Sequence, residues 1–179
     1  MHCASCLEKH HHNGTVTYSH QRLGAALLHP DTREVMPLMP EPIVQQDGTE
    51  KNDCERNAAK RFGSKFRQDH PHLQVSVTEE SLSANAPHIE TLQAHHMHDI
   101  VGVQAGEHPF LFAQVAQAER AGRGTSYARD DHKATVHHRF RFVSHLPRNA
   151  SHPDLRVNFF ACWETMADGT VQHCRWITA

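Results

Sequence analysis

Apolar residues recur every four positions between residues 49 and 69, and this spacing predicts the clearest helix of the chain. The stripe consists of Cys54, Ala58, Phe62 and Phe66. Acidic residues lie early in this range and basic residues lie late, as the helix dipole favours. Shorter apolar patterns predict a helix over 87–95, with Pro87 in its first turn, and another over 109–121.

Alternating apolar and polar residues predict strands in much of the remaining chain. A strand-like segment at 15–29 is followed by a turn and a short strand at 34–38, and we expect these two to pair antiparallel. The segment 39–48 contains two prolines and is predicted to be a loop. Further strands are predicted at 73–77, 100–103, 136–143, 155–163 and 170–177.

The order of these elements predicts an α/β fold. Strands 73–77 and 100–103 flank a helix, so we expect them to lie parallel in one sheet. After Gly122 the periodicity changes to that of antiparallel strands. The chain therefore divides into a Cys/His-rich segment 1–14, an α/β core 15–121 and a β-rich extension 122–179.

Composition restricts the class of protein. Eighteen Lys and Arg against 20 Asp and Glu give a net charge of −2, which excludes a strongly basic protein that coats nucleic acid. No apolar run of about 18 residues or signal peptide is found, so we expect a cytoplasmic protein without a membrane partner. The five cysteines are then expected as thiols or metal ligands. The 19 histidines favour a metal buffer or a pH switch, or reflect sequence drift.

Cys3 and Cys6 are separated by two residues and are followed by His10. Two thiolates at this spacing can reach one Zn²⁺ ion, and a histidine or a distant cysteine such as Cys54 would complete a tetrahedral site. Redox chemistry and no chemical role are the alternatives, and no strand precedes the cysteines to form a redox motif.

Two further groups could carry chemistry. Glu79 and Glu80 directly follow a predicted strand, where open α/β sheets place metal-assisted sites; the alternative is a solvated loop. We expect Glu80 to be solvent-accessible. Basic side chains on the outer face of the helix 49–69 could contact DNA phosphates or simply remain solvated. The candidate DNA contacts are Lys60, Arg61, Lys65 and Arg67.

Several segments resemble bacterial insertion-sequence transposases of the DDE type. Residues 39–62, MPEPIVQQDGTEKNDCERNAAKRF, resemble the family text "PEFI…QDG…KxDCE…AAKRW". Upstream, Cys3-x-x-Cys6 with Lys9-His10 and Tyr18-Ser19-His20 is similar to "CxxC…H…G…YxH". Downstream, residues 78–83 with Pro87-His88-Ile89 resemble "gDxLYxxxPF". The resemblance covers most of the chain and is weakest after residue 125.

The resemblance implies a ribonuclease H-like fold and catalysis by three acids that hold two Mg²⁺ or Mn²⁺ ions. The second acid falls at Glu80, where the family has Asp, and the longer side chain displaces the carboxylate by about 1 Å. The first acid would lie on a strand before the Cys/His-rich segment, and the third in a helix after the β-rich extension. The sequence thus resembles an internal fragment whose core lacks its first strand.

Three hypotheses follow. The first is a DDE transposase remnant, with DNA as its ancestral partner and no catalysis of its own. The second is a small zinc-binding protein that uses Cys3, Cys6 and nearby histidines. The third is a non-catalytic inhibitor that pairs, through the sheet edge left by the absent strand, with itself or with a full-length transposase.

Overall fold

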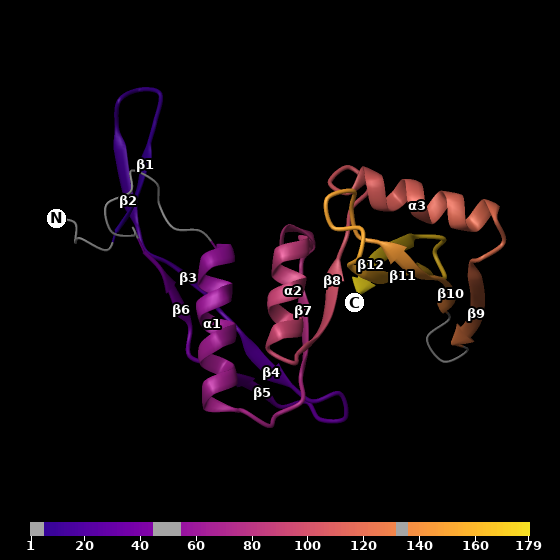
Figure 1. The fold of residues 1–179 in the computed structure, drawn as a ribbon, viewed down its shortest axis with the longest axis horizontal. Coiled ribbons are helices and arrows are strands. Elements are labelled where there is room, and N and C mark those ends of the chain that lie inside the picture. Colours follow the sequence, from indigo (N-terminus) through magenta and orange to yellow (C-terminus); the bar gives the residue numbers. More distant parts are fainter. Residues whose placement is uncertain (1–5, 45–54, 132–135) are drawn as a thin grey trace. The chain divides into compact units, whose positions relative to one another are not determined.

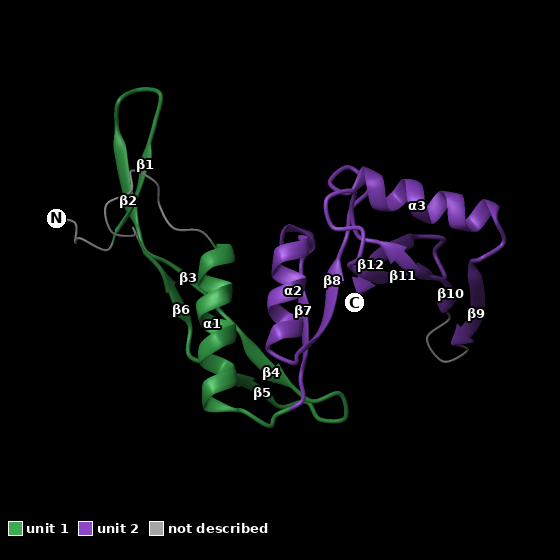
Figure 2. Cartoon of the chain, in the orientation of Figure 1, with its two compact units in different colours: residues 1–73 green, residues 74–179 purple. Residues whose placement is uncertain are grey.

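The structure is a computed structural model that describes residues 6–44, 55–131 and 136–179. These residues form a mixed α/β chain with three α-helices and a six-stranded mixed sheet. The chain divides into two compact units, residues 1–73 and residues 74–179 (Figure 2). The boundary lies inside the segment 15–121, for which the sequence predicts one α/β core.

The described residues of unit 1, 6–44 and 55–73, form antiparallel strand pairs and one helix (Figure 1). Its pairs are β1 (Leu7–His10) with β2 (Val16–Ser19), β3 (Gln21–Leu23) with β6 (Glu41–Ile43), and β4 (Ala26–Leu28) with β5 (Val35–Pro37). The predicted pairing of 15–29 with 34–38 is confirmed only for β4 and β5, because the segment 15–29 forms three strands and the other two, β2 and β3, pair with β1 and β6. The prediction of a loop over 39–48 is wrong at β6. That strand tolerates Pro42 because it has a neighbour on one side only, so a missing N–H can face away from the ladder.

Helix α1 (Glu55–Asp69) packs its apolar side on the strands of unit 1. Ala58 lies in a small core with Leu7 and Ile43, and Leu23 packs against it. Phe66, from the predicted stripe, is also buried, whereas Cys54 and the expected helix start at 49–54 lie outside the described residues.

Unit 2 is built on a six-stranded sheet in the order β7-β8-β12-β11-β10-β9. The strands are β7 (Ser76–Glu79), β8 (His98–Gly102), β9 (Thr125–Asp131), β10 (Val136–Pro147), β11 (Arg156–Thr165) and β12 (Val171–Thr178). β7 and β8 are parallel, as predicted for 73–77 and 100–103, and all other neighbours are antiparallel. β7 is an edge strand, so one of its sides has no partner in this sheet.

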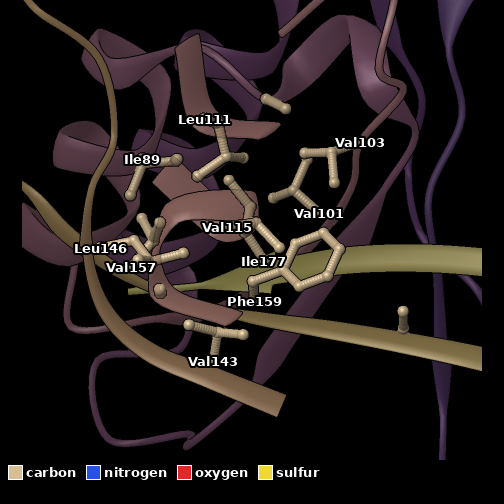
Figure 3. Packing of buried hydrophobic residues seen from close by; sticks show 13 residues of the cluster. Ile89, Val101, Val103, Leu111, Val115, Val143, Leu146, Val157, Phe159 and Ile177 are labelled. Atoms are coloured by element: carbon tan, nitrogen blue, oxygen red, sulfur yellow. The ribbon is translucent and has the colours of Figure 1, made fainter. Parts of the chain in front are cut away.

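Helices α2 (Ala86–Ala94) and α3 (Pro109–Arg120) cover one face of this sheet. Ile89 of α2 and Leu111 of α3 are fully buried with Val101, Val143 and Ile177 of the strands (Figure 3). Asn85 begins α2 by accepting a hydrogen bond from the backbone nitrogen of His88 at 3.1 Å. The helices predicted at 87–95 and 109–121 are thus confirmed to within a residue at each end.

The opposite face of the sheet carries a row of aromatic side chains. Tyr127, Phe140, Phe160 and Trp176 come from four adjacent strands, and their successive ring centroids lie 6.0, 5.8 and 5.3 Å apart. Alternation along the strands separates these residues from the core residues beneath the helices. We call this surface the open face, because Tyr127 is 57% exposed and no described helix of unit 2 covers it.

Candidate functional site

The carboxyl ends of the parallel strands β7 and β8 border a cleft of about 770 Å³. One wall is the end of β7 at Thr78 and Glu79 with the turn that follows, which leads into the short 3-10 helix η1 (Ser81–Ser83). The loop Gly102–Gly106 and the β12 residues His173–Trp176 form the rest. A Cβ atom on Gly102 would lie 3.4 Å from the Ser81 backbone nitrogen, so these two turns approach each other closely.

Two adjacent glutamates on this cleft have different environments. Glu79 is half-buried, and its carboxylate pairs with Nε2 of the buried His88 at 2.5 Å. Glu80 is exposed, as expected, and its backbone carbonyl accepts a hydrogen bond from Ser83. Successive side chains of an extended chain point to opposite sides, which explains why only one of the two carboxylates is sequestered. Glu80 is therefore the carboxylate available to a ligand in the cleft.

Strand β8 carries another acidic residue, Asp99, which has a structural role. Asp99 of β8 is fully buried, and both of its carboxylate oxygens accept from the backbone nitrogen of Ala179 at 3.2 Å. Burial raises the pKa of this carboxyl group, although these hydrogen bonds oppose the change. Asp99 thus fastens the end of β12 to β8 and offers no ligand to the cleft.

The four candidate DNA contacts lie on α1, and two of them already hold unit 1 together. Arg61 Nε donates to the Glu41 carboxylate at 2.7 Å, which ties α1 to β6. Arg67 donates to backbone carbonyls that follow the helix, including that of Leu73 at 3.0 Å. Lys60 and Lys65 are exposed. Lys65 Nζ contacts the Met39 sulfur at 3.9 Å, which is a weak acceptor, so the two lysines are the members of this group that could bind phosphate without breaking an ion pair or a bond to a carbonyl.

The N-terminal metal ligands are separated in the structure. Cys3 lies outside the described residues. Cys6 is buried, and its sulfur is 3.6 Å from Nε2 of His20, a histidine that the predicted ligand set does not include. His10 lies at the far end of β1, about 13 Å from Cys6 at the usual rise of a strand. The structure brings Cys6 to His20 and does not bring it to His10.

A second group of metal-ligand side chains lies on the open face. His138 of β10 and Cys162 and Glu164 of β11 place one ligand atom each within 4.8 Å of one another. Cys162 and Glu164 lie 24 and 26 positions after His138 in the sequence, so a short motif could not identify the group. Their proximity depends on the register of β10 with β11, in which His138 and Glu164 are direct partners.

No protein-family model matches the chain, and a search of curated proteins found no match. Among the described residues, the helices are too short or too polar to cross a membrane.

Proposed function

We propose that the chain derives from the ribonuclease H-like core of a DDE transposase and that these 179 residues do not transfer DNA strands by themselves. The observation that supports this most is the position of Glu80. It is exposed in a cleft at the carboxyl ends of a parallel strand pair, where such a core uses an acid to bind metal. The family motif assigns its second acid to this same residue.

The chemistry of the cleft explains the expected lack of catalysis. Two-metal strand transfer requires several carboxylates that hold two divalent ions about 4 Å apart. Of the two carboxylates that line this cleft, Glu79 is engaged by His88. Glu80 alone can hold at most one hydrated Mg²⁺ or Mn²⁺ ion, and hold it weakly. DNA then remains the ancestral partner, with Lys60 and Lys65 as exposed phosphate contacts.

The site and the lack of activity can be tested separately. Mn²⁺ should broaden the NMR signals of Glu80, Ser81 and Gln104, which line the cleft, and Glu80→Gln should remove this effect. Supercoiled plasmid incubated with the chain and Mg²⁺ or Mn²⁺ should stay intact. Signals of these three residues that stay sharp, or that still broaden in Glu80→Gln, contradict the metal assignment. Nicking that disappears in Glu80→Ala contradicts the proposed lack of catalysis.

A second candidate function depends on the edge strand β7. Its register with β8 directs the backbone groups of Val77 toward β8 and those of Ser76 and Thr78 toward the unpaired side. An unpaired edge is a template for a strand from another chain. We propose that a second copy, or an intact transposase, pairs there and that the chain then acts as an inhibitor.

Thr78→Pro tests this pairing. The substitution removes an N–H that points away from β8, so it should abolish edge pairing without removing a bond of the β7–β8 ladder. Light scattering on the full chain should show a concentration-dependent dimer that Thr78→Pro converts to monomer. Thr78→Ser keeps the N–H and should leave the dimer intact. A dimer that persists in Thr78→Pro would rule out this edge as the interface.

A further inference from the structure

Three side chains of different chemistry converge on the open face of unit 2. The Nδ1 atom of His138 lies 3.4 Å from a carboxylate oxygen of Glu164. Cys162 precedes Glu164 by two residues on the same strand, so its thiol points to the same face. All three potential ligand atoms lie within 4.8 Å of one another. An ion placed among them would contact a nitrogen, a sulfur and an oxygen.

We propose that His138, Cys162 and Glu164 bind a zinc ion with an open fourth position. Imidazole nitrogen, thiolate sulfur and carboxylate oxygen are the three kinds of protein ligand that Zn²⁺ accepts, at bond lengths of about 2.0 to 2.3 Å. Ligand atoms around such an ion lie roughly 3.5 Å apart. Rotation of the side chains that moves each ligand atom by about 1 Å would therefore bring all three within bonding distance of one Zn²⁺ ion, and the strands need not move.

The strands hold these ligands in place before a metal arrives. His138 and Glu164 are cross-strand partners, a relation that keeps their side chains adjacent. The His138 ring stacks on Phe140 with a centroid distance of 5.9 Å and an interplanar angle of 2°, which restricts the orientation of the imidazole. Cys162 is 7% exposed, so its thiol is shielded from water. Glu164 and His138 close the site on the side of the solvent.

Two neighbours define the limits of the site. Cys174 is the register partner of Cys162 on β12 but is exposed, and its sulfur does not belong to the converging group. Arg129 is the register partner of His138 on β9; it is exposed, and its long side chain can turn into solvent. The site is independent of Cys3 and Cys6 in unit 1 and of the proposed transposase ancestry.

Cobalt titration tests the proposal on the full chain under reducing conditions. Co²⁺ bound to a thiolate gives a near-ultraviolet charge-transfer band and visible d–d bands. The variant Cys3→Ser/Cys6→Ser removes the N-terminal thiols, and it should still bind one Co²⁺ ion that Zn²⁺ displaces. In this background Cys162→Ala should abolish the charge-transfer band. Glu164→Gln should weaken Zn²⁺ binding at least about tenfold.

Matched controls distinguish this site from general histidine binding. His137 neighbours His138 on β10 but points to the other face, so His137→Gln should change neither the spectrum nor the affinity. Cys174→Ser should likewise retain the band. Circular dichroism and urea unfolding establish that each variant is folded, and the isosteric change at half-buried Glu164 makes Glu164→Gln the least disruptive of them. A missing thiolate band in the Cys3→Ser/Cys6→Ser protein, or a band that survives Cys162→Ala, would overturn the proposal.

Discussion

His173 occupies a position that disfavours its charged form. Its ring stacks on Trp163 with a centroid distance of 4.4 Å, and its Nδ1 accepts a hydrogen bond from Arg175 at 2.8 Å. Burial lowers the pKa of this imidazole, and the positive charges of Arg175 and Arg139 lower it further. Protonation of His173 is therefore easier in the unfolded chain than in the folded one.

This difference predicts a loss of stability in mild acid. As pH falls below the ordinary histidine pKa of 6.5, the unfolded chain binds a proton first, so the free energy of unfolding decreases until the lower folded pKa is passed. His173→Gln should reduce the loss between about pH 7 and pH 5, measured by urea unfolding. His72→Gln, at an exposed position, is the control and should leave the loss unchanged.

Arg148 is a buried cation that has no acidic partner in the part of the chain that the structure describes. It is 4% exposed, burial lowers its pKa, and its guanidinium contacts Nδ1 of His108 at 3.2 Å. No ion pair among the described residues includes it. An uncompensated buried charge opposes folding.

Arg148→Met should therefore stabilise the protein, by about 1–3 kcal/mol in the free energy of unfolding. The methionine keeps most of the apolar length of the side chain and removes the charge. Arg156→Met is the matched control on the exposed surface, where a change within about 0.5 kcal/mol is expected. Urea unfolding monitored by circular dichroism measures both. A destabilised Arg148→Met protein would mean that the guanidinium has a compensating partner.

Glu79 ends strand β7 and Glu80 follows it, and the two glutamates should respond differently to the same substitution. Glu79→Gln removes the charge that pairs with buried His88, and we expect a loss of about 1–2 kcal/mol. Glu80→Gln alters an exposed carboxylate, and the melting temperature should change by no more than a degree or two, as is usual for exposed sites. Differential scanning calorimetry of both variants provides the comparison. Equal losses would show that Glu80 is also a structural partner.

The elements that the sequence predicts are those with a strong periodic signal. The apolar spacing at Ala58 and Phe66 identifies α1, and that at Leu111 and Val115 identifies α3. The parallel pairing of β7 and β8 is predicted from the helix that lies between them in the sequence. In each case a repeated apolar face is buried, so a local pattern is enough to indicate the structure.

The elements that the sequence does not predict lack such a face. All residues of β9 except Asp131 are exposed, and β1 and β6 are short strands in polar or proline-containing segments. The metal-ligand group of His138, Cys162 and Glu164 depends on strand register, which no short motif encodes. The exposure of Glu80, in contrast, follows from its place after a strand.

The two units have hydrophobic cores of very different size. In the described residues of unit 1, the core consists of Leu7, Ile43 and Ala58, with Leu23 beside it. The core of unit 2 draws on both helices and on strands β8, β10, β11 and β12. Apolar burial is the main source of stability, so unit 2 should be the more stable part.

Hydrogen exchange measured by mass spectrometry should reveal this difference. We expect the backbone amides of α1 and of strands β1 to β6 to exchange at lower denaturant than those of β11 and β12. A chain of residues 74–179 should retain the protection of its sheet, because all residues of its core lie within it. Simultaneous loss of protection in both units would show that they unfold as one.

Both tryptophans of the chain, Trp163 and Trp176, lie in unit 2. Their indole fluorescence therefore reports on the unfolding of this unit. Trp163 stacks directly on His173, and a protonated imidazole quenches indole emission by accepting an electron. The His173–Trp163 contact therefore makes tryptophan emission sensitive to the protonation of His173, and the emission intensity should fall as His173 gains its proton.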